Sequence, residues 1–172
     1  LAAVSAAAPA HQGMAIPRSR RFDRGGGSMT FESWVFINGD DTGAILSYKV
    51  AAGTVLELGL AAGKPYAKAR IGGADQTVTA DTALAAGAWR HVAAIWDASA
   101  SELKVSVDGL VEKSLAVTGS ALSGIGTLTM AGDGTAAATL TDGYLDEVRV
   151  WGYARGLFQT NAQRDVAVDS QA

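Results

Sequence analysis

The sequence predicts an all-β protein, either a sandwich or a barrel, on two observations. Short segments of alternating apolar and polar residues follow one another along the chain, separated by turns that contain glycine. No long helical pattern alternates with these segments, so a parallel sheet of strand–helix–strand units is not indicated. A chain of 172 residues with 48% hydrophobic composition is long enough to bury the core of one domain.

The composition argues against several classes of function. A net charge of −3 and a pI near 5.3 indicate no basic surface for nucleic acid or anionic lipid. No apolar run approaches the ~20 residues of a transmembrane helix, so we expect no membrane span. The absence of cysteine excludes disulfides and thiolate metal centres, and His11 and His91 are too few for a His-rich metal centre.

The clearest element is a hairpin in the second half of the chain. Every second residue of "ELKVSV" (102–107) is apolar, as in a strand with one buried face. The next pair, Asp108-Gly109, favours a tight turn, and residues 110–117 form the return strand. Strands are also expected at 14–18, 29–38, 44–50, 54–60, 65–71, 76–80, 88–97, 126–131 and 143–151.

The strands at 29–38 and 88–97 are apolar on both faces, which is typical of central strands covered on both sides. Only "ARGLFQTNAQRD" (154–165) has a helical pattern, and it predicts a short C-terminal helical turn at an edge of the sandwich. We divide the chain into an N-terminal arm (1–13), the sandwich (14–160) and a C-terminal tail (161–172). Neither end has many anchoring residues, so we expect each to dock on a sandwich edge or on another subunit.

Three blocks carry a resemblance to a known family. They are "MTFESWVFIN" (29–38), "AGAWRHVAAIWDASASELKVSVDGLVEKS" (86–114) and "TDGYLDEVRVWGYAR" (141–155). In order and spacing they resemble laminin-G-like domains of the concanavalin A-like lectin/glucanase superfamily. The resemblance implies a two-sheet antiparallel jelly-roll β-sandwich on an extracellular or surface-exposed protein. Members of the family bind glycans or proteins, or serve as structural spacers.

The carboxylates do not follow the pattern of the hydrolases that share this fold. Those glucanases use a Glu-x-Asp-x-x-Glu strand, which places alternate carboxylates on one face. In this chain the residue two positions after each glutamate is never acidic: it is Trp34, Gly59, Lys104, Ser114 or Arg149. No serine-hydrolase elbow, H-E-x-x-H or phosphate-binding loop occurs either. We therefore predict a protein without enzymatic activity.

Two adjacent carboxylates, Asp146 and Glu147, lie in the last predicted strand. In a regular strand they point to opposite faces and cannot act together. Alternation then places Asp146 on the apolar face, where a carboxylate needs a partner. That partner is either backbone N–H groups or an N-terminal arginine, or it is Ca²⁺, which the resemblance implies because many relatives hold a structural calcium there. The family's N-terminal acidic block is missing from this chain.

One strand offers a ligand surface. In "KPYAKARI" (64–71) alternation leaves Tyr66, Lys68 and Arg70 on the face opposite the apolar residues. An outward tyrosine beside cations can stack on a sugar ring and pair with an acidic substituent, although an ordinary soluble face has the same residue types.

Trp34, Trp89 and Trp96 have apolar neighbours, so we expect them in the core, with sugar stacking as the alternative.

Three functions remain open. The first is a non-catalytic, surface-exposed recognition or adhesion module that binds a glycan or protein surface. The second is a structural assembly subunit, such as a virion (phage) decoration protein or a component of a surface filament. A glycan hydrolase or lyase is the least supported. The first two place the protein on a cell surface, on a virion or in the secreted fraction. The possible partners are a glycan or protein surface, a second copy of the chain, or a virion or filament component.

Overall fold

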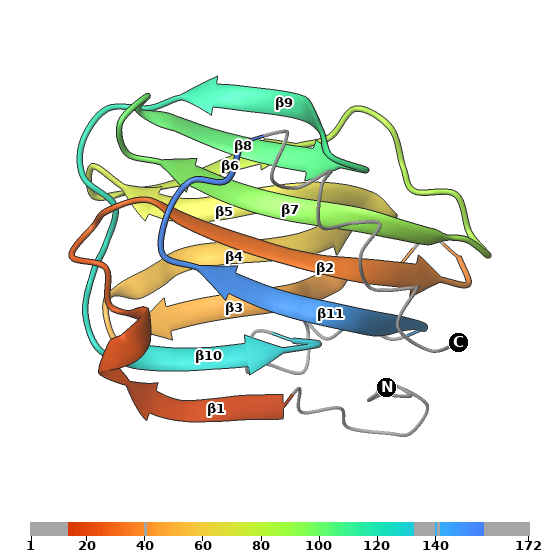
Figure 1. Ribbon diagram of the computed structural model, residues 1–172, viewed down its shortest axis with the longest axis horizontal. Helices are drawn as coiled ribbons and strands as arrows, with labels where there is room; N and C mark the ends of the chain where they lie inside the picture. Colours follow the sequence, from red (N-terminus) through yellow and green to blue (C-terminus); the bar gives the residue numbers. More distant parts are fainter. Residues whose placement is uncertain (1–13, 40, 133–139, 141, 157–172) are drawn as a thin grey trace.

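The computed structural model describes residues 14–39, 41–132, 140 and 142–156, and these form two layers of antiparallel strands (Figure 1). One layer is a six-stranded sheet. In spatial order its strands are β1 (Met14–Ser19), β10 (Gly126–Met130), β3 (Gly43–Val50), β4 (Gly53–Ala61), β5 (Lys64–Ile71) and β6 (Ala74–Thr79).

The second layer is a five-stranded sheet that packs against the first. Its strands, in spatial order, are β11 (Gly143–Trp151), β2 (Met29–Ile37), β7 (Trp89–Asp97), β8 (Glu102–Val107) and β9 (Leu110–Ala116). In Figure 1 this sheet lies in front of the six-stranded one. The two layers make the predicted two-sheet antiparallel sandwich.

The sequence predicts all eleven strands, and every strand end agrees with the structure within two residues. The helical prediction is wrong where it can be compared, because residues 154–156 are not helical. The short helix of the described residues is instead a 3₁₀ turn, η1 (Arg20–Phe22). The remainder of the predicted helical turn, the N-terminal arm and the C-terminal tail lie outside the described residues. In the described part of the chain, no helix has the length and hydropathy to cross a membrane.

The predicted hairpin turn between β8 and β9 is present. Asp108 and Gly109 both have positive φ, 49° and 79°, as a two-residue turn matched to strand twist requires. Asp108 also fixes the neighbouring strand, because its Oδ1 accepts the backbone N–H of His91 at 3.1 Å.

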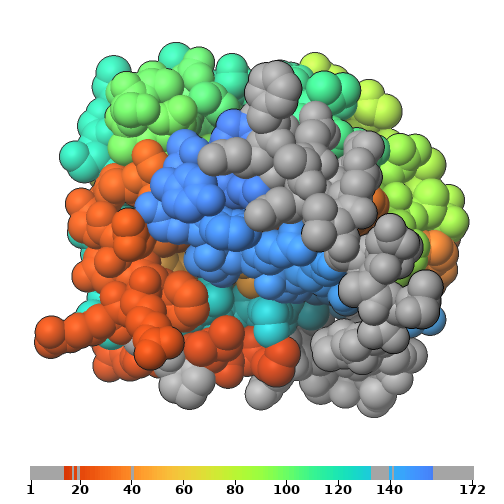
Figure 2. All heavy atoms as spheres, viewed as in Figure 1, coloured from red at the N-terminus to blue at the C-terminus, as the bar shows by residue number. Residues whose placement is uncertain are grey.

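The core lies between the two sheets and takes alternate residues from each strand. Phe31 and Val35 of β2 face Tyr48 of β3 and Leu58 of β4, all fully buried. The side chains between these positions on β2 and β7 point away from the core. Several of them are nevertheless buried, including Glu32. Figure 2 views the molecule from this side and shows β11 and the residues after it (blue) across the middle of the face.

Candidate functional site

The outer face of β5 carries the three residues that the sequence predicts for ligand binding. Tyr66, Lys68 and Arg70 alternate with buried residues, so their side chains lie on the outer face of the six-stranded sheet. The structure therefore places them together along one strand, as the alternation indicates. Their role in ligand binding stays a prediction.

The ring of Tyr66 lies across Gly59, its direct cross-strand partner on β4. A Cβ at position 59 would lie 2.5 Å from Cζ of Tyr66, so only glycine leaves room for the ring. The Tyr66 hydroxyl donates a hydrogen bond of 2.7 Å to Oε1 of Glu57. The sheet and the carboxylate together fix a half-buried aromatic ring in one orientation.

Glu57 is the anchor of this arrangement, and the sequence analysis missed it. Glu57 is only 5% exposed, and its second carboxylate oxygen, Oε2, accepts a hydrogen bond of 2.7 Å from Oγ of Ser47 on β3. The pattern of β4 places Glu57 and Gly59 on the same face. That pattern could have identified both residues, but only the register of β3, β4 and β5 shows that they meet Ser47 and Tyr66.

Lys68 and Arg70 share one carboxylate on the neighbouring strand β6. Asp75 lies 3.9 Å from Nζ of Lys68 and 3.2 Å from Nη1 of Arg70. All three side chains are about one third to one half exposed. Glu57 is the cross-strand partner of Lys68 on β4, so two cations and two carboxylates lie along this part of the face.

An open pocket of about 260 Å³ lies beside Arg70. The loop that precedes β10 forms its wall, because the N–H of Leu122 donates to the carbonyl of Arg70 at 2.8 Å. Gly73, the turn residue after β5, contributes to the opposite rim. The remaining lining residues are Ser120, Ala121 and Ser123.

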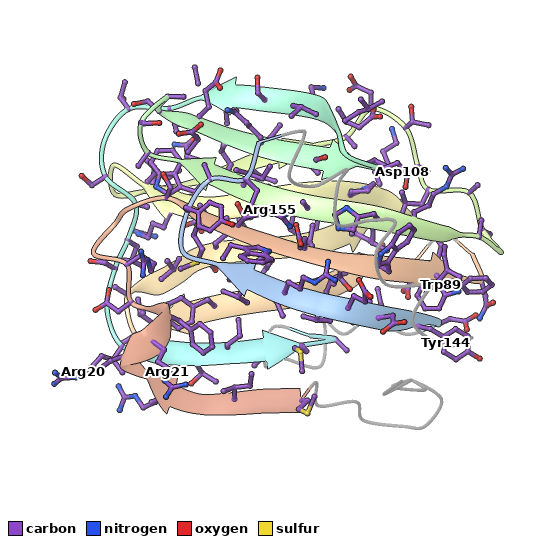
Figure 3. The ribbon with its side chains drawn as sticks, viewed as in Figure 1. Arg20, Arg21, Trp89, Asp108, Tyr144 and Arg155 are labelled. Carbon is purple, nitrogen blue, oxygen red and sulfur yellow. The ribbon has the colours of Figure 1, made fainter. Side chains whose placement is uncertain are left out.

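The five-stranded sheet carries a second surface, a row of three aromatic rings that we call the aromatic row. Phe36 of β2 lies between Trp89 of β7 and Tyr144 of β11, with ring centroids 5.7 and 5.9 Å away. Trp89 is 44% exposed and Tyr144 is 40% exposed. Figure 3 shows both at the same end of the molecule. The sequence does not predict this row, because its members come from three separate strands.

The prediction that the tryptophans pack in the core is right only for Trp96. Trp96 is 3% exposed, and its indole N–H donates to the carbonyl of Gly26. Trp89 is exposed, and Trp34 is half-buried on the outer face with its ring edge-on to His91. The prediction fails because β2 and β7 have apolar residues on both faces, and alternation alone does not tell which face meets the other sheet.

A buried ionic cluster lies farther along the same face of the five-stranded sheet, on the side of Glu32. Glu32 of β2 is fully buried, and its Oε1 accepts a hydrogen bond from Nη1 of Arg155. Arg149 of β11 lies 3.6 Å from the same oxygen. Arg155 also stacks over Trp151, with its guanidinium carbon 4.5 Å from the ring centroid. Figure 3 shows Arg155 over the middle of the sheet.

His91 belongs to the same cluster. Its Nε2 lies 4.0 Å from Oε2 of Glu32. Burial lowers the pKa of His91 below its usual value, the Glu32 carboxylate opposes this shift, and the charges of Arg149 and Arg155 add to it. A weaker effect of Asp108 raises the pKa again. His91 is therefore neutral at pH 7, and the charged members of the cluster are Glu32 and two arginines.

The prediction for the face of Asp146 is wrong. Glu147 has a φ of +49°, and the pairing of β11 with β2 shifts there, which marks a β-bulge. Asp146 therefore lies on the outer face with Tyr144, whereas Leu145 and Val148 pack toward the core. Oδ1 of Asp146 accepts the backbone N–H of Glu147 at 2.8 Å. Of the partners expected from the sequence, the structure thus contains a backbone N–H group.

A structural calcium at Asp146 stays a prediction. Calcium takes six to eight oxygen ligands, mostly carboxylates and carbonyls. Within residues 14–39, 41–132, 140 and 142–156, no three His, Cys, Asp or Glu side chains come together in a way that could hold a metal ion. We derive no function from a metal here.

The fold and these surfaces agree with the comparison to known families. Residues 9–157 match the family described as the concanavalin A-like lectin/glucanases superfamily. The match covers most of the chain, so the chain belongs to this superfamily, as the sequence resemblance implies. No curated protein matches the chain.

Solved structures show the same fold at low sequence identity. The SAP-like pentraxin of Limulus polyphemus is 15% identical, with a TM-score of 0.62, and the match covers 87% of this chain and 70% of the pentraxin. The binding domain of botulinum neurotoxin DC, solved with rat synaptotagmin II, is 9% identical, with a TM-score of 0.65 and coverages of 87% and 38%. A candidate carbohydrate binding protein of Bacteroides ovatus is 20% identical, with a TM-score of 0.59 and coverages of 78% and 40%. This chain thus spans well under half of the toxin and Bacteroides chains.

Proposed function

We propose that this chain is a non-catalytic recognition module that binds a glycan on the outer face of its six-stranded sheet. The orientation of Tyr66 carries the proposal. Its ring is fixed across Gly59 and bonded to Glu57, and it stays half-buried. A fixed aromatic ring stacks on the apolar face of a sugar at little cost in conformational entropy. Lys68 and Arg70, on the same face of β5, supply donors for sugar oxygens.

Membership of a lectin-like superfamily supports this proposal, and so does a structural neighbour described as a candidate carbohydrate binding protein. We also propose a surface-exposed location, secreted or on a cell or virion surface, because a module that recognises a glycan must be exposed to it. The alternative, an assembly subunit of a virion or filament, was based on residues 1–13 and 161–172. These lie outside the described residues, so no observation favours it over recognition.

The test is binding of the purified protein to an array of neutral, uronic-acid, sialylated and sulfated oligosaccharides, followed by calorimetry with the glycans that bind. Replacing Tyr66 by Ala removes the ring and is expected to weaken binding about tenfold or more. Tyr66→Phe keeps the ring and is expected to retain most of the affinity. A thermal melt of each variant establishes that it is folded.

Tyr144→Ala is the matched control, since it removes an exposed tyrosine from the other sheet. The proposal predicts that this variant binds like the unmodified protein. It fails if no glycan binds, or if Tyr144→Ala abolishes binding while folded Tyr66→Ala does not. The latter result would indicate that the glycan binds at the aromatic row instead.

A further inference from the structure

We propose that the pocket beside Arg70 receives an anionic substituent of the glycan, a carboxylate or a sulfate ester, so that the site selects acidic over neutral oligosaccharides. This inference rests on the proposed function and names the class of ligand for the same site. It is based on the hydrogen-bonding capacity of Arg70, the lining of the pocket, and the distance between Arg70 and Tyr66.

Arg70 has unused hydrogen-bonding capacity. A guanidinium has five N–H donors, arranged to bind two oxygens of a carboxylate or sulfate side by side. In the described part of the chain its one side-chain acceptor is Asp75, at 3.2 Å from Nη1. The Arg70 side chain is 38% exposed at the edge of the pocket, so its other donors are within reach of a ligand.

The pocket lining suits an anion better than an apolar group. Ser120 and Ser123 are exposed, and neither hydroxyl makes a hydrogen bond with any residue that the structure describes. No carboxylate lines the pocket itself. Lys68 is flanked by Asp75 and by its cross-strand partner Glu57, so Arg70 is the cation that lines the pocket. A ligand anion in the pocket would therefore meet guanidinium and hydroxyl donors and no lining carboxylate.

The spacing along β5 defines the length of the ligand. The Cα atoms of Tyr66 and Arg70, four residues apart on one strand, are separated by about 13 Å. A separation of this size favours two different sugars, one that stacks on Tyr66 and one that places its substituent beside Arg70. The ligand is therefore an oligosaccharide whose anionic group belongs to a different sugar from the one that stacks. The pocket volume of about 260 Å³ is sufficient for one substituted ring, and not for a whole oligosaccharide.

The test compares acidic and neutral glycans of the same backbone on the array described above. Galacturonate oligomers and their methyl esters differ in the charge and in the ester methyl group. Sulfated and unsulfated chondroitin oligomers both keep their uronate carboxylates, so this second pair isolates the effect of the sulfate. The unmodified protein is expected to bind acidic glycans at least about tenfold more tightly than neutral counterparts. Arg70→Gln is expected to reduce this ratio to near one, because it weakens binding of acidic glycans much more than binding of neutral ones.

Arg90→Gln is the matched control. Arg90 is likewise an arginine with one aspartate partner, and its side chain is 42% exposed, but it lies on the five-stranded sheet. The inference is overturned if Arg90→Gln lowers the ratio as much as Arg70→Gln, or if acidic and neutral glycans bind equally. In the second case Tyr66-dependent binding would leave the proposed function intact. If no glycan binds at all, the proposed function and the inference fail together. A melt of Arg70→Gln confirms that it is folded.

Discussion

The carboxylate of Glu32 lies under Arg155, where neither side chain reaches solvent. Removing water from two charges is costly, and the pair is stable only because each charge has the other as a close partner. The arrangement becomes strongly unfavourable when one partner is lost, because the remaining charge is then buried alone. Stability at this position therefore depends on the pair rather than on either residue.

Arg155→Met is expected to lower the free energy of unfolding by about 3 kcal/mol, because Glu32 is then buried with the more distant Arg149, at 3.6 Å, and the neutral His91 as its neighbours. Urea denaturation measures the loss. Arg90→Met breaks an ion pair of 2.7 Å whose side chains are 42% and 26% exposed, and it is expected to cost about 1 kcal/mol or less. Equal losses in the two variants would show that burial of the Glu32 pair has no energetic consequence.

His91 makes stability depend on pH. Because its pKa is lowered in the folded state, the unfolded chain binds more protons as the pH falls below the unfolded pKa of about 6.5. Stability is therefore greatest above that pH and decreases as the pH falls through it toward the folded pKa. Urea denaturation between pH 7.5 and 5.5 is expected to show this decrease. His91→Gln should flatten it, and an unchanged slope in that variant would assign the pH dependence to other groups.

Alternation along a strand predicts side-chain direction only where the strand is regular. It places Tyr66, Lys68 and Arg70 correctly because β5 pairs with β4 without a register shift. It fails for Asp146, because the bulge at Glu147 changes the phase of every later residue of β11. Glutamate has no preference for positive φ, so the sequence contains no signal for this bulge.

The bulge in β11 constrains the backbone of the five-stranded sheet at Glu147. Glu147 has a φ of +49°, and its side chain pairs with Arg149 at 2.6 Å. A β-branched residue is strained in this conformation, whereas glycine is not. Glu147→Val is expected to lower the free energy of unfolding by about 1–2 kcal/mol more than Glu147→Gly. Both variants lose the ion pair, so thermal melts showing equal stability would argue against backbone strain.

The edge strand β9 is protected against pairing with other chains. Leu110 and Val111 are exposed, so this unpaired edge carries apolar surface that favours association with another chain. Its register with β8 shifts at Glu112, and Lys113 lies opposite the buried core residue Val105. A bulge and an inward-pointing charge are two devices that natural sheets use to prevent edge-to-edge association.

Lys113→Val is expected to promote self-association, because it removes this charge and extends the apolar surface of the edge. Sedimentation velocity at increasing protein concentration measures the effect. Lys104→Val is a suitable comparison, since Lys104 lies on β8 away from the edge and its pairs with Asp97 and Glu102 are on the sheet face. Association in neither variant would show that the bulge alone protects the edge.

The ends of the strands could be predicted from the sequence better than the question of which strands pair with one another. Glycine-containing turns and alternating segments fix all eleven strands within two residues. The pairing of distant strands, such as β1 with β10 or β11 with β2, depends on contacts across more than a hundred residues. The aromatic row exists only through such a pairing, which is why it could not be located from the sequence. The contacts of Glu57 come from the consecutive strands β3, β4 and β5, and they depend on the register of those strands.

At the scale of the whole molecule, the two sheets have separate tasks. The six-stranded sheet carries the proposed binding residues of β5, Tyr66, Lys68 and Arg70. The five-stranded sheet carries the buried ionic cluster of Glu32, Arg149, Arg155 and His91. In the part of the chain that the structure describes, Arg70 pairs with Asp75 and Arg155 pairs with Glu32, which lie on different sheets. Binding and stability are thus expected to change independently.

The double variant Arg70→Gln/Arg155→Met tests this separation. Its loss of stability is expected to equal the sum of the two single losses within about 0.5 kcal/mol. Arg155→Met alone is expected to bind glycans normally at temperatures where it is folded. A coupling energy well above that value, measured by urea denaturation of all four proteins, would show that the sheets communicate through the core.

The burial of Arg155 also determines whether a protease can cut the chain after this residue. A trypsin-like enzyme cuts after arginine only when the side chain enters its own specificity pocket. Arg155 is 4% exposed and engaged with Glu32, whereas Arg18 and Arg20 are exposed. The peptide bond between Arg155 and Gly156 is therefore cleavable only in molecules in which the ion pair has opened. Under conditions where opening is faster than cleavage, the rate of cutting at this bond reports the free energy of that local opening.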